Sequence, residues 1–317
     1  MATGPALPLL PEPLPLGELS DPLLVDPGPR LLRAVVEAYR EVAPALVDPT
    51  VGDLASGESK GRDSTQVDHL PTLRVLAGES AIDAAAAGFR SASRLAALLD
   101  DGAVDLRVLD APQPNPVLAG DETGFALIGG ENDDAPAGDD ESTVDGGTDR
   151  DRRWHRVGDD ASLRGRYGPD FADAELYRLR TPSRRRVYGG FASRCDKSVA
   201  VAVLRALDAP TDPTGADDSP GPTAGPDPEE TRIRTYAVGA REEVLDRTLR
   251  RACEDAGLGS PSTFTRIKRL LRESDLIETA SESQPVGRPR ERLVARGALA
   301  AAETAEETVA AVRGVTE

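Results

Sequence analysis

The stretch from Ser260 to Arg290 carries hydroxyl and basic side chains in an order that suits contacts with nucleic acid. Short hydroxyl residues come first, and basic residues follow them along a predicted helix that covers residues 261–274. Guanidinium, ammonium and hydroxyl groups donate hydrogen bonds to phosphate oxygens and base edges, and the amino end of a helix can enter the major groove. The candidate DNA-binding residues are therefore Ser260, Ser262, Thr263, Thr265, Arg266, Lys268, Arg269, Arg288 and Arg290.

Two local signals position these side chains. Gly257 supplies the positive φ that ends a preceding helix, and Ser260 followed by Pro261 is typical of a helix start. Within the helix, apolar residues recur three and four positions apart and predict one buried stripe. The stripe comprises Phe264, Ile267, Leu270 and Leu271, which leaves the hydroxyl and basic residues on the opposite face.

A polar segment, residues 281–292, follows this helix and contains a Gly-Arg-Pro-Arg sequence. Gly287 permits a tight turn, and Pro289 has no N–H to donate to a strand ladder, so both suit the tip or edge of a hairpin. Arg288 and Arg290 would then reach phosphates or the minor groove. The segment therefore predicts a basic wing beside the helix.

Two further helices are expected upstream, from Pro228 through Tyr236 and over 241–256. Three helices and a hairpin predict a winged helix-turn-helix over residues 228–297. Two alternatives stay open. In the first, the stretch is a helical hairpin with a solvated basic face and does not bind DNA. In the second, it is a protein-interaction module that docks another regulator without binding DNA.

The composition is strongly acidic, with a net charge of −17 at pH 7 over 317 residues. Lys60, Lys197 and Lys268 are the only lysines among 38 basic residues. Such a surface resembles that of proteins from salt-loving archaea, in which carboxylates keep the protein hydrated. Residues 261–296 carry eight basic against five acidic residues, so the overall acidity does not exclude nucleic acid. The Debye length is about 3 Å at molar salt, so binding there would depend on close contacts.

The upstream sequence predicts a smaller domain. Residues 1–28 are rich in proline and lack the basic start of a signal peptide, so we expect a disordered leader. A helix over 30–45, strands near 72–77, 105–109 and 123–129, and helical sequence between the first two strands predict an α/β sensor or dimerisation domain over 29–130.

The remaining segments are connections. We expect an acidic linker at 131–149, a basic helical connector at 150–208, a Pro/Asp-rich linker at 209–227 and a C-terminal helix at 298–317 that dimerises the protein or caps the wing. The connector includes Arg184-Arg185-Arg186, which either forms a second nucleic-acid contact or balances the acidic loops. The predicted fold class is α+β: a small N-terminal α/β domain, a helical connector and a C-terminal winged helix-turn-helix.

Sequence motifs for catalysis, metal or cofactors are missing. No phosphate-binding Gly-x-x-x-x-Gly-Lys loop occurs, His69 and His155 are isolated, and Cys195 and Cys253 lack metal-ligand spacing. Trp154 either stacks on a ligand or packs the connector. We therefore expect no enzyme, no catalytic residue, no cofactor and no metal, in a reducing cytoplasmic compartment with no membrane span.

The stretch around Gly257-Leu258, Ser262-Thr263 and Gly287-Arg288-Pro289-Arg290 resembles winged-helix proteins. With the domain order and composition, the whole chain resembles the haloarchaeal regulator family called TbsP, which is linked to sugar-responsive TrmB-like regulators. The resemblance implies a sequence-specific regulator of metabolic genes. It also implies double-stranded DNA as a partner, a homodimer, and a small-metabolite effector or second regulator. TrmB-like sensors resemble phospholipase D, an enzyme that carries a His-x-Lys motif. Neither His69 nor His155 has a lysine two positions later, so no catalytic version is expected.

Overall fold

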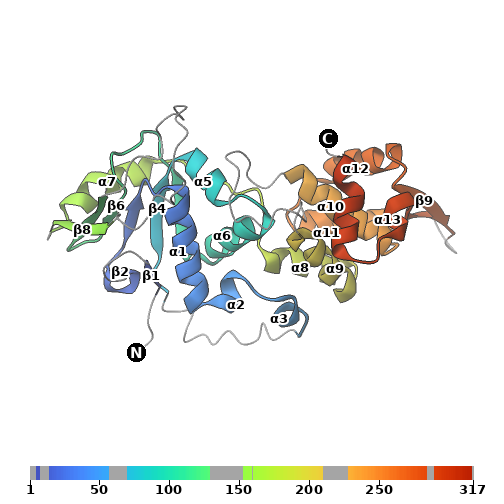
Figure 1. Ribbon diagram of the computed structural model, residues 1–317, viewed down its shortest axis with the longest axis horizontal. Coiled ribbons are helices and arrows are strands. Elements are labelled where there is room, and N and C mark those ends of the chain that lie inside the picture. Colours follow the sequence, from blue (N-terminus) through green and yellow to red (C-terminus); the bar gives the residue numbers. More distant parts are fainter. Residues whose placement is uncertain are drawn as a thin grey trace, which may run out of the picture. The chain divides into compact units, whose positions relative to one another are not determined.

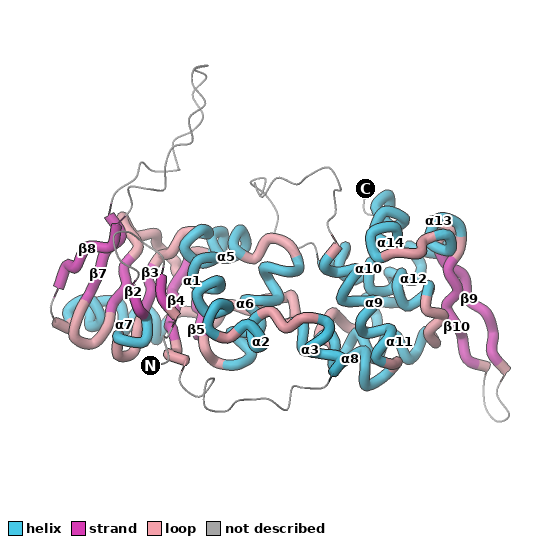
Figure 2. Tube along the Cα trace, turned by 60° about the horizontal axis from the view of Figure 1, so that its bottom comes forward, coloured by secondary structure: helices cyan, strands magenta, loops and turns pink. Residues whose placement is uncertain are grey.

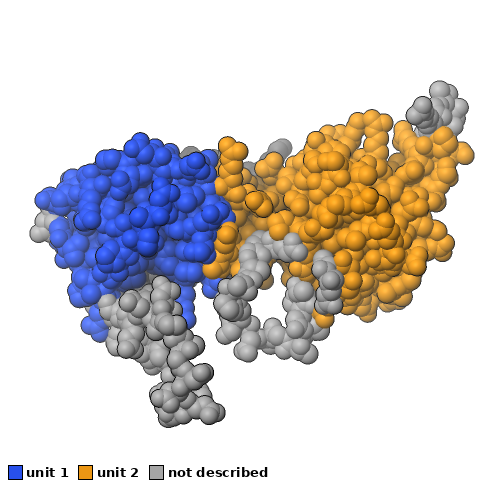
Figure 3. All heavy atoms as spheres, turned by 90° about the horizontal axis from the view of Figure 1, so that it is seen from above, with its two compact units in different colours: residues 1–43, 64–82, 102–177 blue, residues 44–63, 83–101, 178–317 orange. Residues whose placement is uncertain are grey.

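The computed structural model describes residues 5–7, 14–56, 70–128, 153–158, 160–209, 228–283 and 289–315. The chain divides into two compact units, which are coloured separately in Figure 3. Unit 1 comprises residues 1–43, 64–82 and 102–177, and unit 2 comprises residues 44–63, 83–101 and 178–317. Among the residues described, no helix is long and apolar enough to cross a membrane.

Unit 1 is built on a six-stranded sheet in the order β5-β4-β3-β6-β7-β8 (Figure 2). The strands β3 (Leu23–Val25), β4 (Leu73–Ala77) and β5 (Val104–Val108) run parallel. The strands β6 (Val117–Ala119), β7 (Gly124–Ile128) and β8 (Arg153–Gly158) continue the sheet as antiparallel neighbours. A short hairpin of β1 (Ala6–Leu7) and β2 (Leu14–Pro15) and the 3-10 turn η1 (Leu16–Glu18) precede the sheet.

The central strand β3 is buried on both faces of the sheet. Leu23 and Val25 pack with Tyr167 and Phe171 of α7 (Ser162–Asp173). Because side chains alternate along a strand, Leu24 points to the other face, and it is also fully buried. Figure 1 shows α1 (Pro29–Val42) running alongside β4. The predicted strands at 72–77, 105–109 and 123–129 are confirmed as β4, β5 and β7.

Two segments of unit 1 differ from the prediction. The predicted leader, residues 1–28, contains β3, which is a central strand of the sheet. Three apolar residues between Pro22 and Pro27 are too few to give a strand pattern, so the proline content hid them. The predicted connector at 150–208 is not one helical element, because β8 pairs with β7 and α7 packs on the sheet of unit 1.

Unit 2 contains the rest of that connector. The helices α8 (Arg184–Arg194) and α9 (Lys197–Asp208) share one hydrophobic core with α10 (Pro228–Arg241), α11 (Asp246–Asp255) and α12 (Pro261–Glu273). The hairpin of β9 (Ile277–Glu282) and β10 (Arg290–Ala295) follows. Three other helices, α2 (Pro44–Val47), α3 (Val51–Ser56) and α6 (Phe89–Asp101), also belong to unit 2, whereas α5 (Glu79–Ala85) crosses the division between the units.

The central helix of unit 2 is α10, which is buried along most of its length. Gly239 allows α11 to approach, since a Cβ on Gly239 would lie 2.4 Å from Leu249 Cδ2. Arg234, also buried, donates from Nη1 to the carbonyl oxygens of Ala206 and Ala209 at 3.2 and 2.7 Å. These bonds satisfy carbonyl groups at the end of α9, which otherwise lack partners inside their own helix.

The C-terminal segment forms two short helices where one was predicted at 298–317. They are α13 (Gly297–Ala301) and α14 (Ala305–Val312), followed by the turn η4 (Arg313–Val315). Thr304 and Glu307 form a capping box that starts a new helix at Ala305. The apolar side chains of Leu299, Val309 and Val312 are buried in the core of unit 2.

Candidate nucleic-acid interface

The helix α12 begins with the predicted cap and is fixed by its apolar stripe. Ser260 Oγ accepts a hydrogen bond from Thr263 N at 3.4 Å, and Pro261 occupies the first helical position. Phe264, Ile267 and Leu271 are fully buried. The Phe264 ring also stacks on Tyr236 of α10, with centroids 5.8 Å apart. This packing fixes which side chains of α12 face outward.

Hydroxyl groups cluster at the exposed amino end of α12. Ser260 Oγ lies 2.8 Å from Ser262 Oγ and 3.1 Å from Thr263 Oγ1. Thr265 Oγ1 donates to the carbonyl of Pro261 at 3.0 Å and accepts from Arg250 Nη1 at 3.0 Å. The four predicted hydroxyl residues therefore lie together around the first turn, in a position from which hydroxyl groups can exchange partners with a phosphate.

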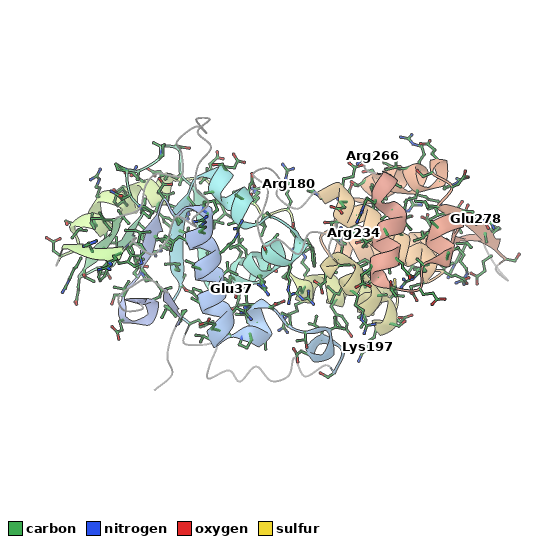
Figure 4. All side chains as sticks on the ribbon, viewed as in Figure 1. Glu37, Arg180, Lys197, Arg234, Arg266 and Glu278 are labelled. Atoms are coloured by element: carbon green, nitrogen blue, oxygen red, sulfur yellow. The ribbon has the colours of Figure 1, made fainter. Side chains whose placement is uncertain are left out.

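Arg266 lies on the outer face of α12, with 49% of its side chain exposed. Figure 4 shows it at the edge of unit 2, whereas Arg234 lies among the helices. Its Nη1 donates to Glu229 Oε1 at 2.7 Å, from the first turn of α10. This bond lowers the pKa of Glu229 and raises that of Arg266. Because exposed ion pairs contribute little free energy, the guanidinium remains available for a competing acceptor.

Lys268 points inward, with only 12% of its side chain exposed. Its Nζ lies 2.5 Å from Glu291 Oε2 on β10 and 3.4 Å from Asp246 Oδ2 on α11. Asp246 is 3% exposed and also accepts hydrogen bonds from Tyr236 and Arg250. Lys268 thus belongs to an ionic network that joins α10, α11, α12 and the wing, and its predicted contact with DNA stays untested.

The network perturbs the acid at its centre. Burial raises the pKa of Asp246, but hydrogen bonds from Arg250 and Tyr236 and the charge of Lys268 outweigh it, so the pKa is lowered overall. Burial, and then the charge of the same carboxylate, raise the pKa of Tyr236. Asp246 is therefore a buried anion whose charge is stabilised by three donors.

The hairpin β9–β10 matches the predicted wing. Arg290 pairs in register with Glu282 and its side chain is exposed. Arg292 fixes the hairpin, since its guanidinium donates to Glu282 Oε2 at 2.7 Å and to the carbonyl of Glu243 at 2.6 Å. Arg288 lies outside the described residues, so its predicted contact stays a prediction.

Several cations beside α12 were not among the predicted site residues. For comparison, the predicted site residue Arg269 has a side chain that is 72% exposed, and its Nε lies 3.8 Å from Glu273 Oε1. Arg247, Arg251 and Arg272 are exposed as well. Arg250 supports Thr265 from α11, and the basic run in the Asp246–Arg251 sequence is the signal that would have included it.

Two features of unit 1 bear on the binding of a small ligand. The parallel strands β3, β4 and β5 end at one edge of the sheet, where Asp26 (φ 53°) accepts a hydrogen bond from Gln113 N at 2.6 Å. Elsewhere in the unit a cavity of about 500 Å³ is lined by residues that include Glu18, Asp121, Arg156 and Asp160. In the part of the chain that the structure describes, no group of side chains fits a metal ion.

The isolated residues of the sequence have structural positions. Trp154 lies half-buried on β8 opposite Leu127, and His155 is exposed on the same strand. Cys253 is fully buried and Cys195 partly so, and burial raises the pKa of both thiols, that of Cys195 to about 11. Raised pKa values make both thiols poor nucleophiles. His69 lies outside the described residues.

Comparison with protein-family models matched both parts of the chain. Residues 58–182 match the N-terminal model of TbsP-like transcriptional regulators, and residues 183–313 match the model of their C-terminal helix-turn-helix domain. The second match begins at Ser183, directly before α8, so it includes the two helices that share the core with α10–α12. No curated protein and no solved structure gave a significant match.

Proposed function

The chain belongs to the family of TbsP-like transcriptional regulators, and we propose that it binds specific sites in double-stranded DNA through α12 and the β9–β10 wing. The observation that carries this proposal is the outer face of α12. Its amino end is capped and rich in hydroxyl groups, its apolar stripe is locked in the core, and Arg266 and Arg269 project outward one turn apart.

Arg266 and Arg269 are the side chains that we expect to contact base edges in the major groove. A bidentate arginine–guanine contact contributes about 1–3 kcal/mol of discrimination against the wrong base. Ser260, Ser262, Thr263 and Thr265 surround the helix start, where phosphate oxygens are favoured by the free N–H groups. Arg288 and Arg290 of the wing would contact the backbone or the minor groove.

We further propose that the protein acts in the cytoplasm as a homodimer on two-fold-symmetric sites of metabolic genes, with unit 1 sensing a small metabolite or a second regulator. The carboxyl edge of parallel strands is where open α/β sheets bind ligands, which supports a sensor role for unit 1. The acidic, lysine-poor composition supports a haloarchaeal regulator that works at high salt, and the resemblance to the TbsP family implies its association with TrmB-like regulators.

The test is a selection of genomic fragments by the purified full-length protein at molar KCl. We expect a discrete enriched site with two-fold symmetry. Arg272→Ala, on the last turn of the same helix, should enrich the site as the wild type does, whereas Arg266→Ala should enrich it much less, because one base contact is missing. If the folded wild-type protein enriches no site, the proposal is wrong, and a module that docks another protein becomes the better account.

A further inference from the structure

The three consecutive arginines at the start of α8 have different surroundings. Arg184 is 5% exposed, forms an ion pair with Asp208, and donates from Nε to the carbonyl of Pro49 at 3.1 Å. Arg185 is exposed and donates to the carbonyl of Ala45 at 3.0 Å. Arg186 is exposed, and within the described parts of the chain it has neither an ion pair nor a hydrogen bond from its side chain. The first two therefore serve the packing of unit 2, whereas the third does not.

Arg186 lies against the turn that joins α11 to α12. A Cβ on Gly257 would lie 3.0 Å from Arg186 Cζ, so the guanidinium covers this glycine (φ 78°). One helical turn later, a Cβ on Gly190 would lie 2.7 Å from the backbone nitrogen of Ala256. The face of α8 that carries Arg186 and Gly190 is thus packed against the end of α11, and this fixes where Arg186 projects.

A second guanidinium near the turn is already engaged. Arg232 of α10 donates from Nε to the carbonyl of Leu258 at 2.7 Å. A Cβ on Gly259 would lie 3.2 Å from the same Nε. Arg232 therefore holds the turn in place. The guanidinium of Arg186, in contrast, donates no hydrogen bond to any of the residues that the structure describes.

We propose that Arg186 extends the DNA interface beyond α12 and the wing and binds a backbone phosphate beside the amino end of α12. This inference rests on the proposed function, because it requires α12 to enter the groove. Ser260, which caps α12, follows Gly257 by three positions, so a phosphate at the helix start lies near the guanidinium. The planar fork of arginine donates two parallel hydrogen bonds to a phosphate, and such close contacts persist where salt screens long-range attraction.

The neighbouring Arg185 gives a matched control. Both residues are exposed, carry the same charge and lie in the first turn of α8. A general effect of net charge would be the same for Arg185→Gln and Arg186→Gln, whereas a phosphate contact would be lost only in Arg186→Gln. Arg186→Lys keeps the charge without the fork and should retain part of the binding.

The experiment measures binding of the full-length wild type and the three variants to the selected site and to unrelated DNA over a range of KCl concentrations. For Arg186→Gln we expect weaker binding to both DNAs by the same factor, and a slope of log K against log[KCl] that is smaller in magnitude by about 0.9. Arg185→Gln should match the wild type, and the thermal unfolding midpoint of each variant checks that it is folded.

The possible outcomes separate the two proposals. If the wild type binds its site and Arg186→Gln has the wild-type affinity and slope, the phosphate contact is wrong and the proposed function stands. Equal losses in Arg185→Gln and Arg186→Gln would also overturn the contact, because they would reflect net charge. A folded wild type that binds no DNA overturns both.

Discussion

The outer face of α12 and the seam where Lys268 of α12 meets Asp246 of α11 and Glu291 of β10 both contain cations of α12, but these cations have different surroundings. Arg266 is half exposed and pairs with a surface carboxylate, whereas Lys268, two positions later, lies between the buried Asp246 and Glu291 of the wing. Two positions along a helix correspond to a rotation of about 200°, so the side chains leave opposite faces. Cations of one helix therefore have different surroundings, which depend on where the acidic partners lie.

The largest effect should come from removing the acid at the centre of the seam. Asp246→Ala leaves Lys268 and Arg250 without their shared buried carboxylate, so we expect a loss of about 3 kcal/mol or more in the free energy of unfolding. The control is Asp255→Ala, at the other end of α11, which removes an exposed partner of Arg194. It should change the free energy of unfolding by less than about 1 kcal/mol. Denaturant unfolding measures both. Equal effects would mean that the seam is not a structural network.

Lys268→Met should have the next largest effect. It removes a nearly buried ammonium that joins α12 to the wing, and we expect a loss of about 1.5–3 kcal/mol in unfolding free energy, as for hydrogen bonds to charged groups. Arg269→Met, on the outer face, should leave stability unchanged and weaken DNA binding. If Lys268→Met keeps wild-type stability and only DNA binding falls, Lys268 contacts DNA as the sequence predicted.

Acid should affect the seam through Asp246. Its pKa is lowered in the folded protein, so its stabilising contribution is present above the unfolded pKa of about 3.9 and is lost as the pH falls through the folded pKa. We expect the unfolding free energy of the wild type to fall more steeply below pH 4 than that of Asp246→Asn. Parallel acid profiles of the two proteins would contradict the ionised network.

The smallest effect concerns the exposed pair on the outer face. Glu229→Gln removes the carboxylate that accepts a hydrogen bond from Arg266. In this variant the Arg266 guanidinium does not have to break an ion pair before it contacts DNA. We expect stability to be unchanged and DNA affinity to rise by a factor on the order of a few. Glu230→Gln would be a poor control, because Glu230 binds the buried Arg234. Glu273→Gln would be another, because Glu273 pairs with Arg269. The exposed Glu254 of α11 gives the control Glu254→Gln. Weaker binding by Glu229→Gln would mean that the pair orients Arg266 for DNA.

Local signals explain why α12 and the wing were predictable. The cap at Ser260, Pro261, and the apolar stripe from Phe264 to Leu271 all lie within one helix, and turn residues marked the hairpin. The inward position of Lys268 was not predictable, because its partners Asp246 and Glu291 come from other elements. The strand β3 was hidden by its length and by the prolines around it. The packing of α8 and α9 on α10 depends on contacts between segments that are far apart in the sequence, which no local pattern indicates.

The most direct test of the outer face is a loss-of-contact experiment on the selected DNA site. Each base pair of the site is replaced in turn, and binding of the wild type and of Arg266→Ala is measured. The wild type should lose about 1–3 kcal/mol at each contacted base pair. At one of these positions Arg266→Ala should bind the original and replaced sequences equally, while it still discriminates at the others. If Arg266→Ala discriminates at every position as the wild type does, Arg266 does not read a base, and the account of the outer face is wrong.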